Sequence, residues 1–107
     1  MNLHNVVAKM IAAQNNFDND AYAACFTENA TVHDEGKTHN GKNEISQWIG
    51  HSNQQYQAVM KPLTYEEAGS EYLLTAEVSG NFPGSPATLK FHIGLENELI
   101  RSLKITG

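Results

Sequence analysis

The spacing of hydrophobic residues changes near Val59, and this change limits the folds that the chain can adopt. Before Val59 the apolar residues follow the three-and-four spacing of amphipathic helices, and after it they alternate with polar residues. The alternation is clearest through Leu89, Phe91, Ile93 and Leu95. Helices followed by long strands predict an α+β domain.

The first half of the chain predicts three helices, over residues 3–14, 19–26 and 42–58, with Asp18 placed to cap the second. Ala30–Thr31–Val32 predicts a short strand that brings Asp34 to its far end. Strands follow from Val59, with a loop over 81–86 and a last strand over 99–106. Three short helices cannot fill the concave side of one strongly bent antiparallel sheet, so we expect a pocket at its open end.

Composition excludes several classes of function. A chain of 107 residues predicts a single domain, residues 1–107. Its net charge of −5 and its scattered basic residues argue against a nucleic-acid surface. No segment reaches membrane-spanning length, the N-terminus does not resemble a signal peptide, and Cys25 has no cysteine partner. We therefore expect a cytoplasmic protein that binds neither nucleic acid nor membranes.

The order of these elements, with the stretch from Phe17 to Trp48 at its centre, resembles the SnoaL-like branch of the nuclear transport factor 2-like superfamily, which includes the steroid delta-isomerases. The residues that carry the resemblance are Ala12–Ala13, Asn15, Asp18, Phe26, Ala30–Thr31–Val32, Asp34, Gly41, Ile45 and Trp48, with the C-terminal pattern from Val78 to Ile105. The resemblance covers nearly the whole chain and implies a cystatin-like cone, in which a bent antiparallel sheet wraps around three N-terminal helices. Because this superfamily contains enzymes, binding proteins and subunits, the fold alone assigns no function.

The resemblance implies that Asp34 is a catalytic base, because the isomerases carry an aspartate at the end of the same strand. An apolar pocket raises the pKa of a carboxylate by desolvation, which would make Asp34 a usable base near neutral pH. The alternative is that Asp34 turns the chain with Gly36 and faces water. Met10 and Phe91 stand where the isomerases have their oxyanion donors, so we do not expect steroid isomerase activity.

Histidines and acids close together, His33 to Glu35 with His39, raise the possibility of a metal site. Neighbouring residues of a strand point to opposite faces, however, and the spacing is not a recognised one. We therefore expect solvated histidines, no metal and no cofactor.

The inward positions of the first and third helices and of the strands predict the walls of the pocket. The expected ligand-binding residues are Met10, Val32, Trp48, Phe91, Ile93 and Leu103, whereas Tyr22, Tyr56 and Tyr72 are expected in the core. The sequence thus predicts binding of a small apolar organic molecule, with Asp34 as base in isomerase-like or cyclase-like proton transfer or in hydrolysis. The alternative is a non-catalytic ligand-binding or interaction domain.

The outer face of the sheet is expected to carry Leu73, His92, Gly94 and Ile100, a moderately apolar and flat surface. We expect a homodimer through this face, as the family resemblance also implies, with Gly94 allowing close approach of the partner. The alternative is a monomer with a solvated outer face.

Overall fold

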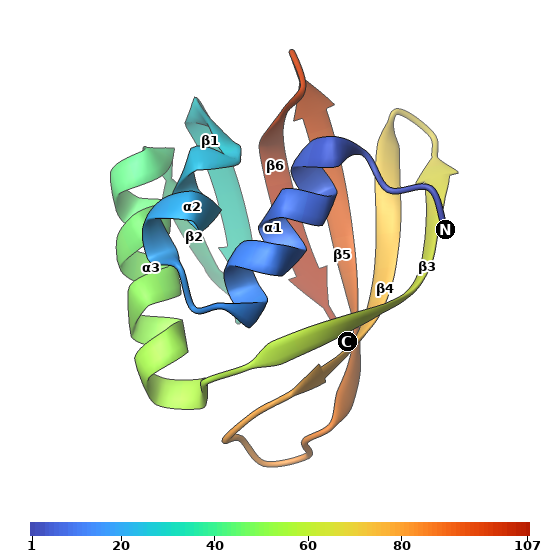
Figure 1. Cartoon of the computed structure of the whole chain (residues 1–107). Coiled ribbons are helices and arrows are strands. Elements are labelled where there is room, and N and C mark those ends of the chain that lie inside the picture. Colours follow the sequence, from blue (N-terminus) through green and yellow to red (C-terminus); the bar gives the residue numbers. More distant parts are fainter.

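One curved, open sheet of six strands lies behind three helices in a computed structural model that describes residues 1–107 (Figure 1). The elements are α1 (Asn5–Asn15), α2 (Asn19–Ala24), β1 (Phe26–Asp34), β2 (Lys37–Asn40), α3 (Gly41–Tyr56), β3 (Val59–Ala68), β4 (Glu71–Ser79), β5 (Ala87–Glu96) and β6 (Leu99–Thr106). The predicted α+β class is confirmed, with helices gathered on the concave side of the sheet.

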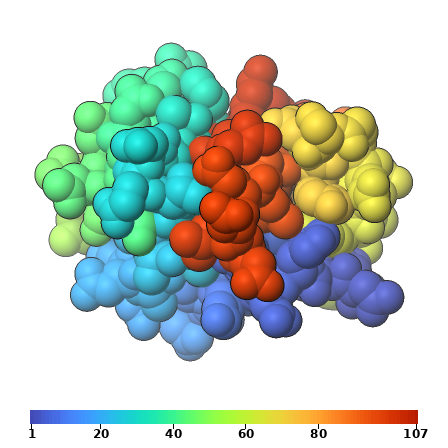
Figure 2. All heavy atoms as spheres, turned by 90° about the horizontal axis from the view of Figure 1, so that it is seen from above, coloured from blue at the N-terminus to red at the C-terminus, as the bar shows by residue number.

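The strands follow the order β2-β1-β6-β5-β4-β3. All neighbouring strands are antiparallel except β1 and β6, whose parallel pairing the sequence did not predict. Viewed from above, β5 and β6 lie between β1 with α3 on one side and β3 with β4 on the other, while α1 and α2 cover one face (Figure 2). The last strand therefore occupies the middle of the sheet.

A tight hairpin joins β1 to β2, a strand that the sequence did not predict. Asp34 pairs with Lys37, so only Glu35 and Gly36 form the loop, and their φ angles are 54° and 74°. Positive φ at both central residues is the requirement of a type I′ turn. β1 is also longer than the three residues expected, and it places Asp34 at its end.

Side chains at the helix ends fix the positions of α1 and α2. The predicted cap of α2 is present, since Asp18 accepts a hydrogen bond from the backbone N–H of Ala21 at 3.1 Å. At the end of α1, the Asn15 side-chain amide bonds both the N–H of Met60, at 2.8 Å, and its carbonyl, at 3.0 Å. These two hydrogen bonds hold the C-terminal end of α1 against the start of β3.

The core lies between α1 and the middle of the sheet. Val7 and Met10 of α1 are fully buried, as are Phe26, Ile93 and Leu103 of the sheet. Each buried side chain of this size contributes about 1.5–3 kcal/mol relative to its exposed state. This packing fixes α1 across the concave face.

Two expectations for the outer face are wrong. Ile100 is fully buried in the core, because Arg101 forms a bulge between the Gly94–Ser102 and Leu95–Ile100 pairs and reverses the alternation of β6. Gly94 is also unavailable to a partner backbone. A Cβ atom there would lie 2.4 Å from Ser102 Oγ and 3.0 Å from the Arg101 guanidinium, so this chain's own side chains cover the position.

Candidate functional site

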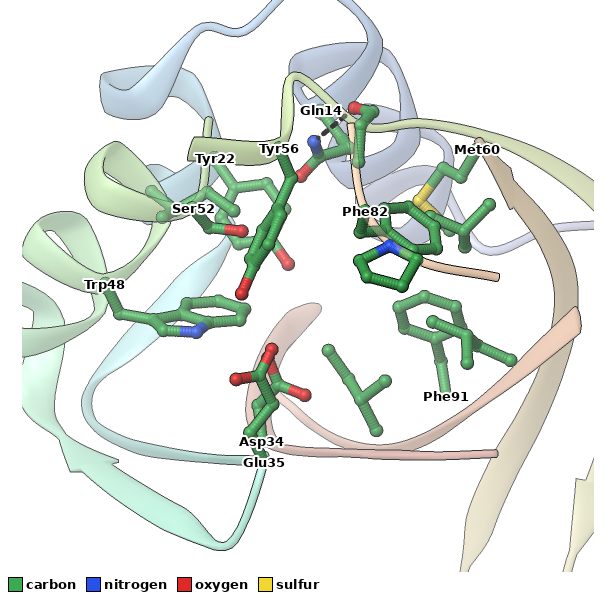
Figure 3. A pocket seen from close by; sticks show the side chains of 16 residues that line it. Gln14, Tyr22, Asp34, Glu35, Trp48, Ser52, Tyr56, Met60, Phe82 and Phe91 are labelled. Carbon is green, nitrogen blue, oxygen red and sulfur yellow. Dashed lines mark hydrogen bonds between the residues drawn. The ribbon is translucent and has the colours of Figure 1, made fainter. Parts of the chain in front are cut away.

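An apolar cavity of about 340 Å³ lies between α3, the end of β1 and the strands β4 to β6 (Figure 3). Eleven of its sixteen lining residues are hydrophobic. The lining comprises Gln14, Tyr22, Asp34, Glu35, Trp48, Ile49, Ser52, Tyr56, Ala58, Met60, Val78, Phe82, Pro83, Leu89, Phe91 and Ile105. A cavity of this size lies at the small end of the range for ligand pockets, which are mostly apolar with few polar groups.

Helix α3 forms one wall because Trp48, Ser52 and Tyr56 are spaced four residues apart and share a face. The loop after β4 forms another wall through Phe82 and Pro83. Gly80 lets this loop approach the end of α3, since a Cβ atom there would lie only 2.6 Å from the carbonyl oxygen of Tyr56.

Asp34 is half-buried at one end of the cavity, with Glu35 beside it (Figure 3). Desolvation raises the pKa of its carboxyl above the ordinary value, and the neighbouring charge of Glu35 raises it further. Hydrogen bonding from the Trp48 side chain, the charge of His39 and the backbone N–H of Glu35 act in the opposite direction. The net rise makes Asp34 a stronger base than an exposed aspartate.

Asp34 can accept a proton from a ligand, but a ligand oxygen in the cavity would also need a hydrogen-bond donor. The Tyr22 hydroxyl is a candidate for this donor. Tyr22 is 3% exposed and lines the cavity. Its hydroxyl bonds no other protein group, and since no fully buried side-chain oxygen lacks a partner, the hydroxyl must be accessible from the cavity. Burial, followed by the nearby charge of Asp34, raises the pKa of its phenol, so Tyr22 stays protonated at physiological pH. It can therefore donate to a ligand oxygen in the cavity.

A polar hollow of about 630 Å³ adjoins the cavity and shares Asp34, Glu35, Trp48, Ser52 and Tyr56 with it. Its other residues are polar or charged: Lys37, His39, Glu44, Gln47, His51 and Gln55. The His39 ring stacks on the Trp48 indole, with 5.6 Å between centroids and 29° between planes. The apolar cavity thus continues into a hydrated, charged mouth next to Asp34.

Three of the residues predicted for the site line the cavity: Asp34, Trp48 and Phe91. The alternation that predicted Asp34 inward and His33 outward is also correct, since His33 is exposed and pairs with the Thr38 hydroxyl at 2.9 Å. The remaining four predicted lining residues do not reach the cavity: Met10, Val32, Ile93 and Leu103 are fully buried in the core. They have the expected inward orientation, but Val32, Ile93 and Leu103 lie on the part of the sheet that α1 covers, and Met10 is on α1 and packs in the same core.

Sequence reasoning missed several residues of the site. Tyr22 belongs to the core, as expected, but it also lines the cavity. Tyr56 was expected in the core and lines the cavity instead, whereas Tyr72 packs on Tyr65 with 5.6 Å between ring centroids. Glu35 had a detectable signal, because a glutamate precedes glycine in a two-residue turn that favours asparagine or aspartate there. Gln14 had a weaker one, as a polar residue on the apolar stripe of its helix.

No group of three or more His, Cys, Asp or Glu side chains is arranged to hold a metal ion. The suspected cluster is divided, because His39 stacks on Trp48 while His33 lies on the other side of the strand. None of the helices combines the length and the apolar character needed to cross a bilayer.

Fold and cavity together define a small cone-shaped α+β protein with a ligand-sized hollow at its open end. The sequence model of a family described as the SnoaL-like domain matches residues 7–98. The chain belongs to this SnoaL-like family. No functionally curated protein matches it.

Solved structures with the same fold include both enzyme-like and uncharacterised proteins. A candidate polyketide cyclase from Sinorhizobium meliloti is 34% identical, with a TM-score of 0.92 over 97% of this chain and 95% of that one. A protein with a ketosteroid isomerase-like fold from Catenulispora acidiphila, solved with trimethylamine, is 19% identical, with a TM-score of 0.87 over 99% and 87%. An uncharacterised cystatin-fold protein from Novosphingobium aromaticivorans is 19% identical, with a TM-score of 0.80 over 100% and 99%.

Proposed function

We propose that this protein binds a small apolar organic molecule in the cavity and transfers a proton to or from it, with Asp34 as the general base. The observation that supports the proposal is a carboxylate of raised pKa in an apolar cavity that is also lined by the Tyr22 phenol, whose hydroxyl is free to bond a ligand. The likeness to a candidate polyketide cyclase points to the same kind of substrate, a carbonyl compound.

In the proposed reaction, Asp34 removes a proton from the carbon next to a carbonyl group of the ligand. Negative charge then develops on the carbonyl oxygen, and it needs a donor in a site that excludes water. The Tyr22 hydroxyl supplies that donor, replacing the one that Met10 cannot provide. In an isomerase-like step, Asp34 then returns the proton to another carbon of the ligand. In a cyclase-like step, the deprotonated carbon first forms a bond to a second carbonyl carbon of the ligand, and Asp34 gives the proton to the alkoxide that results.

The test is exchange of ligand protons with solvent deuterium, followed by NMR on apolar aryl ketones. We expect exchange catalysed by the wild-type protein and a loss of about 10²–10⁴-fold in Asp34→Asn. Asp20→Asn is the matched control, since Asp20 is an exposed carboxylate in the first turn of α2, away from the cavity lining.

The second candidate function is a non-catalytic ligand-binding domain. It is favoured by Met10, which is buried in the core and can donate no hydrogen bond. Calorimetric binding of the ketones without any deuterium exchange would support this function and contradict the proposed proton transfer.

We also propose that two copies pair through the outer face of the sheet. A continuous row of outward residues crosses four strands, from Leu73 through His92 and Lys104 to His33. Leu73 and His92 are half-buried within one copy, and this row replaces Gly94 as the expected centre of the contact.

Light scattering at micromolar concentration tests the dimer. We expect twice the single-chain mass of 11.8 kDa for the wild type and the single-chain mass for Leu73→Glu. Glu77→Lys, a change at an exposed residue near the end of the same strand, should leave the dimer intact. A wild-type mass near that of one chain contradicts the proposal.

A further inference from the structure

We propose that Gln14 selects the ligand: its side-chain oxygen accepts a hydrogen bond from a hydroxyl or N–H group at the end of the ligand remote from Asp34. This inference rests on the proposed function, because it assumes that the cavity holds a ligand. It narrows the ligand class to apolar carbonyl compounds that also carry a hydrogen-bond donor.

The orientation of the Gln14 amide is set by its neighbours. Its nitrogen donates to the carbonyl oxygen of Ala58 at 2.7 Å and to Asn53 Oδ1 at 3.1 Å. A backbone carbonyl can only accept, so the nitrogen of Gln14 must face it. Asn53 is fixed in turn, because its own nitrogen donates to Asn19 Oδ1 at 2.6 Å.

Both hydrogens of the amide nitrogen are therefore used, and the oxygen remains. Gln14 is only 9% exposed, and both hydrogen bonds of its side chain are donated by the nitrogen. No fully buried side-chain oxygen of this protein lacks a hydrogen-bond partner, so the unbonded oxygen of Gln14 must be accessible from the cavity. It is not sealed in the core either, because Gln14 lines the cavity, at the end opposite Asp34 and Glu35 (Figure 3). The chain thus presents a single, rigidly held acceptor to whatever fills this end.

The surroundings of this oxygen explain why it can select a ligand. Gln14 shares its end of the cavity with Met60 and Phe82 (Figure 3) and with Ala58, to which it is hydrogen-bonded. None of these three offers a side-chain donor. An apolar ligand end in this position would cover the Gln14 oxygen without bonding it. Leaving an acceptor buried and unpaired in this way costs about 1–3 kcal/mol of binding free energy. A ligand donor recovers that free energy, and a methyl ether, which lacks the hydrogen, does not.

No Lys, Arg or His side chain lines the apolar cavity, so an anionic group on the ligand would find no counter-charge there. An ammonium group would be buried at the Gln14 end without the Asp34 and Glu35 carboxylates beside it, which is costly, so the donor on the ligand is a neutral hydroxyl or N–H group. The ligand's carbonyl lies at the Asp34 and Tyr22 end, and its donor lies at the Gln14 end.

Three aryl ketones that differ at one position test this arrangement: 2-acetonaphthone with hydrogen, hydroxyl or methoxy at position 6. Calorimetry should show that the wild-type protein binds the hydroxyl compound about 5–150-fold more tightly than the methoxy compound. Equal affinity for the three compounds overturns the role of Gln14 and leaves the proposed function standing. Binding of none of them contradicts both.

The variant Gln14→Met keeps the length of the side chain and removes the acceptor. Gln14→Met should bind the hydroxyl and methoxy compounds with about equal affinity. Gln54→Met, at an exposed position on α3, should still prefer the hydroxyl compound. Because Gln14 also holds Ala58 and Asn53, the variant could fail to fold. Wild-type NMR then decides: the Gln14 side-chain carbonyl carbon should shift with the hydroxyl compound and not with the methoxy compound, and no difference between them refutes the inference.

Discussion

The concave face of the sheet is closed at one end and open at the other, although the same strands form both. Under α1, Ile93 of β5 and Leu103 of β6 are fully buried. Two to four residues along the same strands, on the same face, Phe91, Leu89 and Ile105 line the cavity instead. The difference arises from where α1 ends: its last turns reach the start of β3 through Gln14 and Asn15, and no helix fills the space beyond.

The hydrophobic pattern of the sequence does not distinguish an inward residue in the packed core from an inward residue at a cavity wall. Alternation along a strand determines which residues face inward. Whether an inward residue meets another side chain or a cavity depends on helices packed from elsewhere in the chain. The closed end should therefore respond to mutation through stability, and the open end through ligand binding.

The largest expected effect comes from shortening leucines at the two ends. Leu103→Ala should lower the free energy of unfolding by about 2–4 kcal/mol, because it leaves a void in the packed core. Leu89→Ala, at the half-buried cavity wall, should cost less than about 1.5 kcal/mol, since that side chain already borders empty space. Urea denaturation measures both. Similar losses for the two variants would mean that the open end is packed like the closed one.

A smaller effect of opposite sign is expected for Asp34→Asn. The folded state raises the pKa of Asp34, so stability falls as pH rises from the ordinary carboxyl range through this pKa. At pH 7 the variant avoids this cost, and its Tm should rise by about 2–6 °C. At pH 3.5, below the ordinary pKa of aspartate, Asp34 is mostly neutral in both the folded and the unfolded state, and most of the gain should vanish.

Thermal unfolding of Asp34→Asn at pH 7 and pH 3.5 checks this prediction, with Asp20→Asn as control. Asp20 is exposed in the first turn of α2, where its charge favours the helix, so its removal should bring no gain. A lower Tm for Asp34→Asn at pH 7 would show that the carboxylate supports the fold rather than the chemistry.

The smallest expected effect concerns Glu35, whose φ of 54° is unfavourable for glutamate. Glu35→Asn should stabilise the protein by about 0.5–1 kcal/mol, because asparagine tolerates this conformation in a type I′ turn. It also removes the charge that raises the pKa of Asp34, so the pH profile of deuterium exchange should move to lower pH. Gly36→Ala tests the backbone alone. Its φ of 74° predicts destabilisation by about 1 kcal/mol, and a gain there would contradict the turn geometry.

The sequence predicted the elements better than the site. The helices, the long strands and the inward orientation of Asp34, Trp48 and Phe91 follow from local spacing, which acts over neighbouring residues. The parallel pairing of β1 with β6 joins segments far apart in the chain, and no local signal carries it.

The residues of the site were missed for the same reason, because local spacing does not show what a side chain meets in the folded protein. Tyr22 was assigned to the core because a buried aromatic next to packed neighbours has the same pattern as one beside a hollow. Phe82 belongs to an irregular loop, where periodicity gives no orientation. Ile100 was placed outside because the bulge at Arg101 shifts the alternation by one residue.

The central position of β6 has a consequence for how this protein is made. Within the sheet, the hairpin of β1 and β2 meets the three-stranded unit of β3 to β5 only through β6. A ribosome releases β6 after all the other strands, so the two parts of the sheet cannot be hydrogen-bonded into one sheet until this segment is inserted between them. Chains whose contacts span such long separations fold slowly. The nascent protein should therefore complete its sheet only after β6 has emerged.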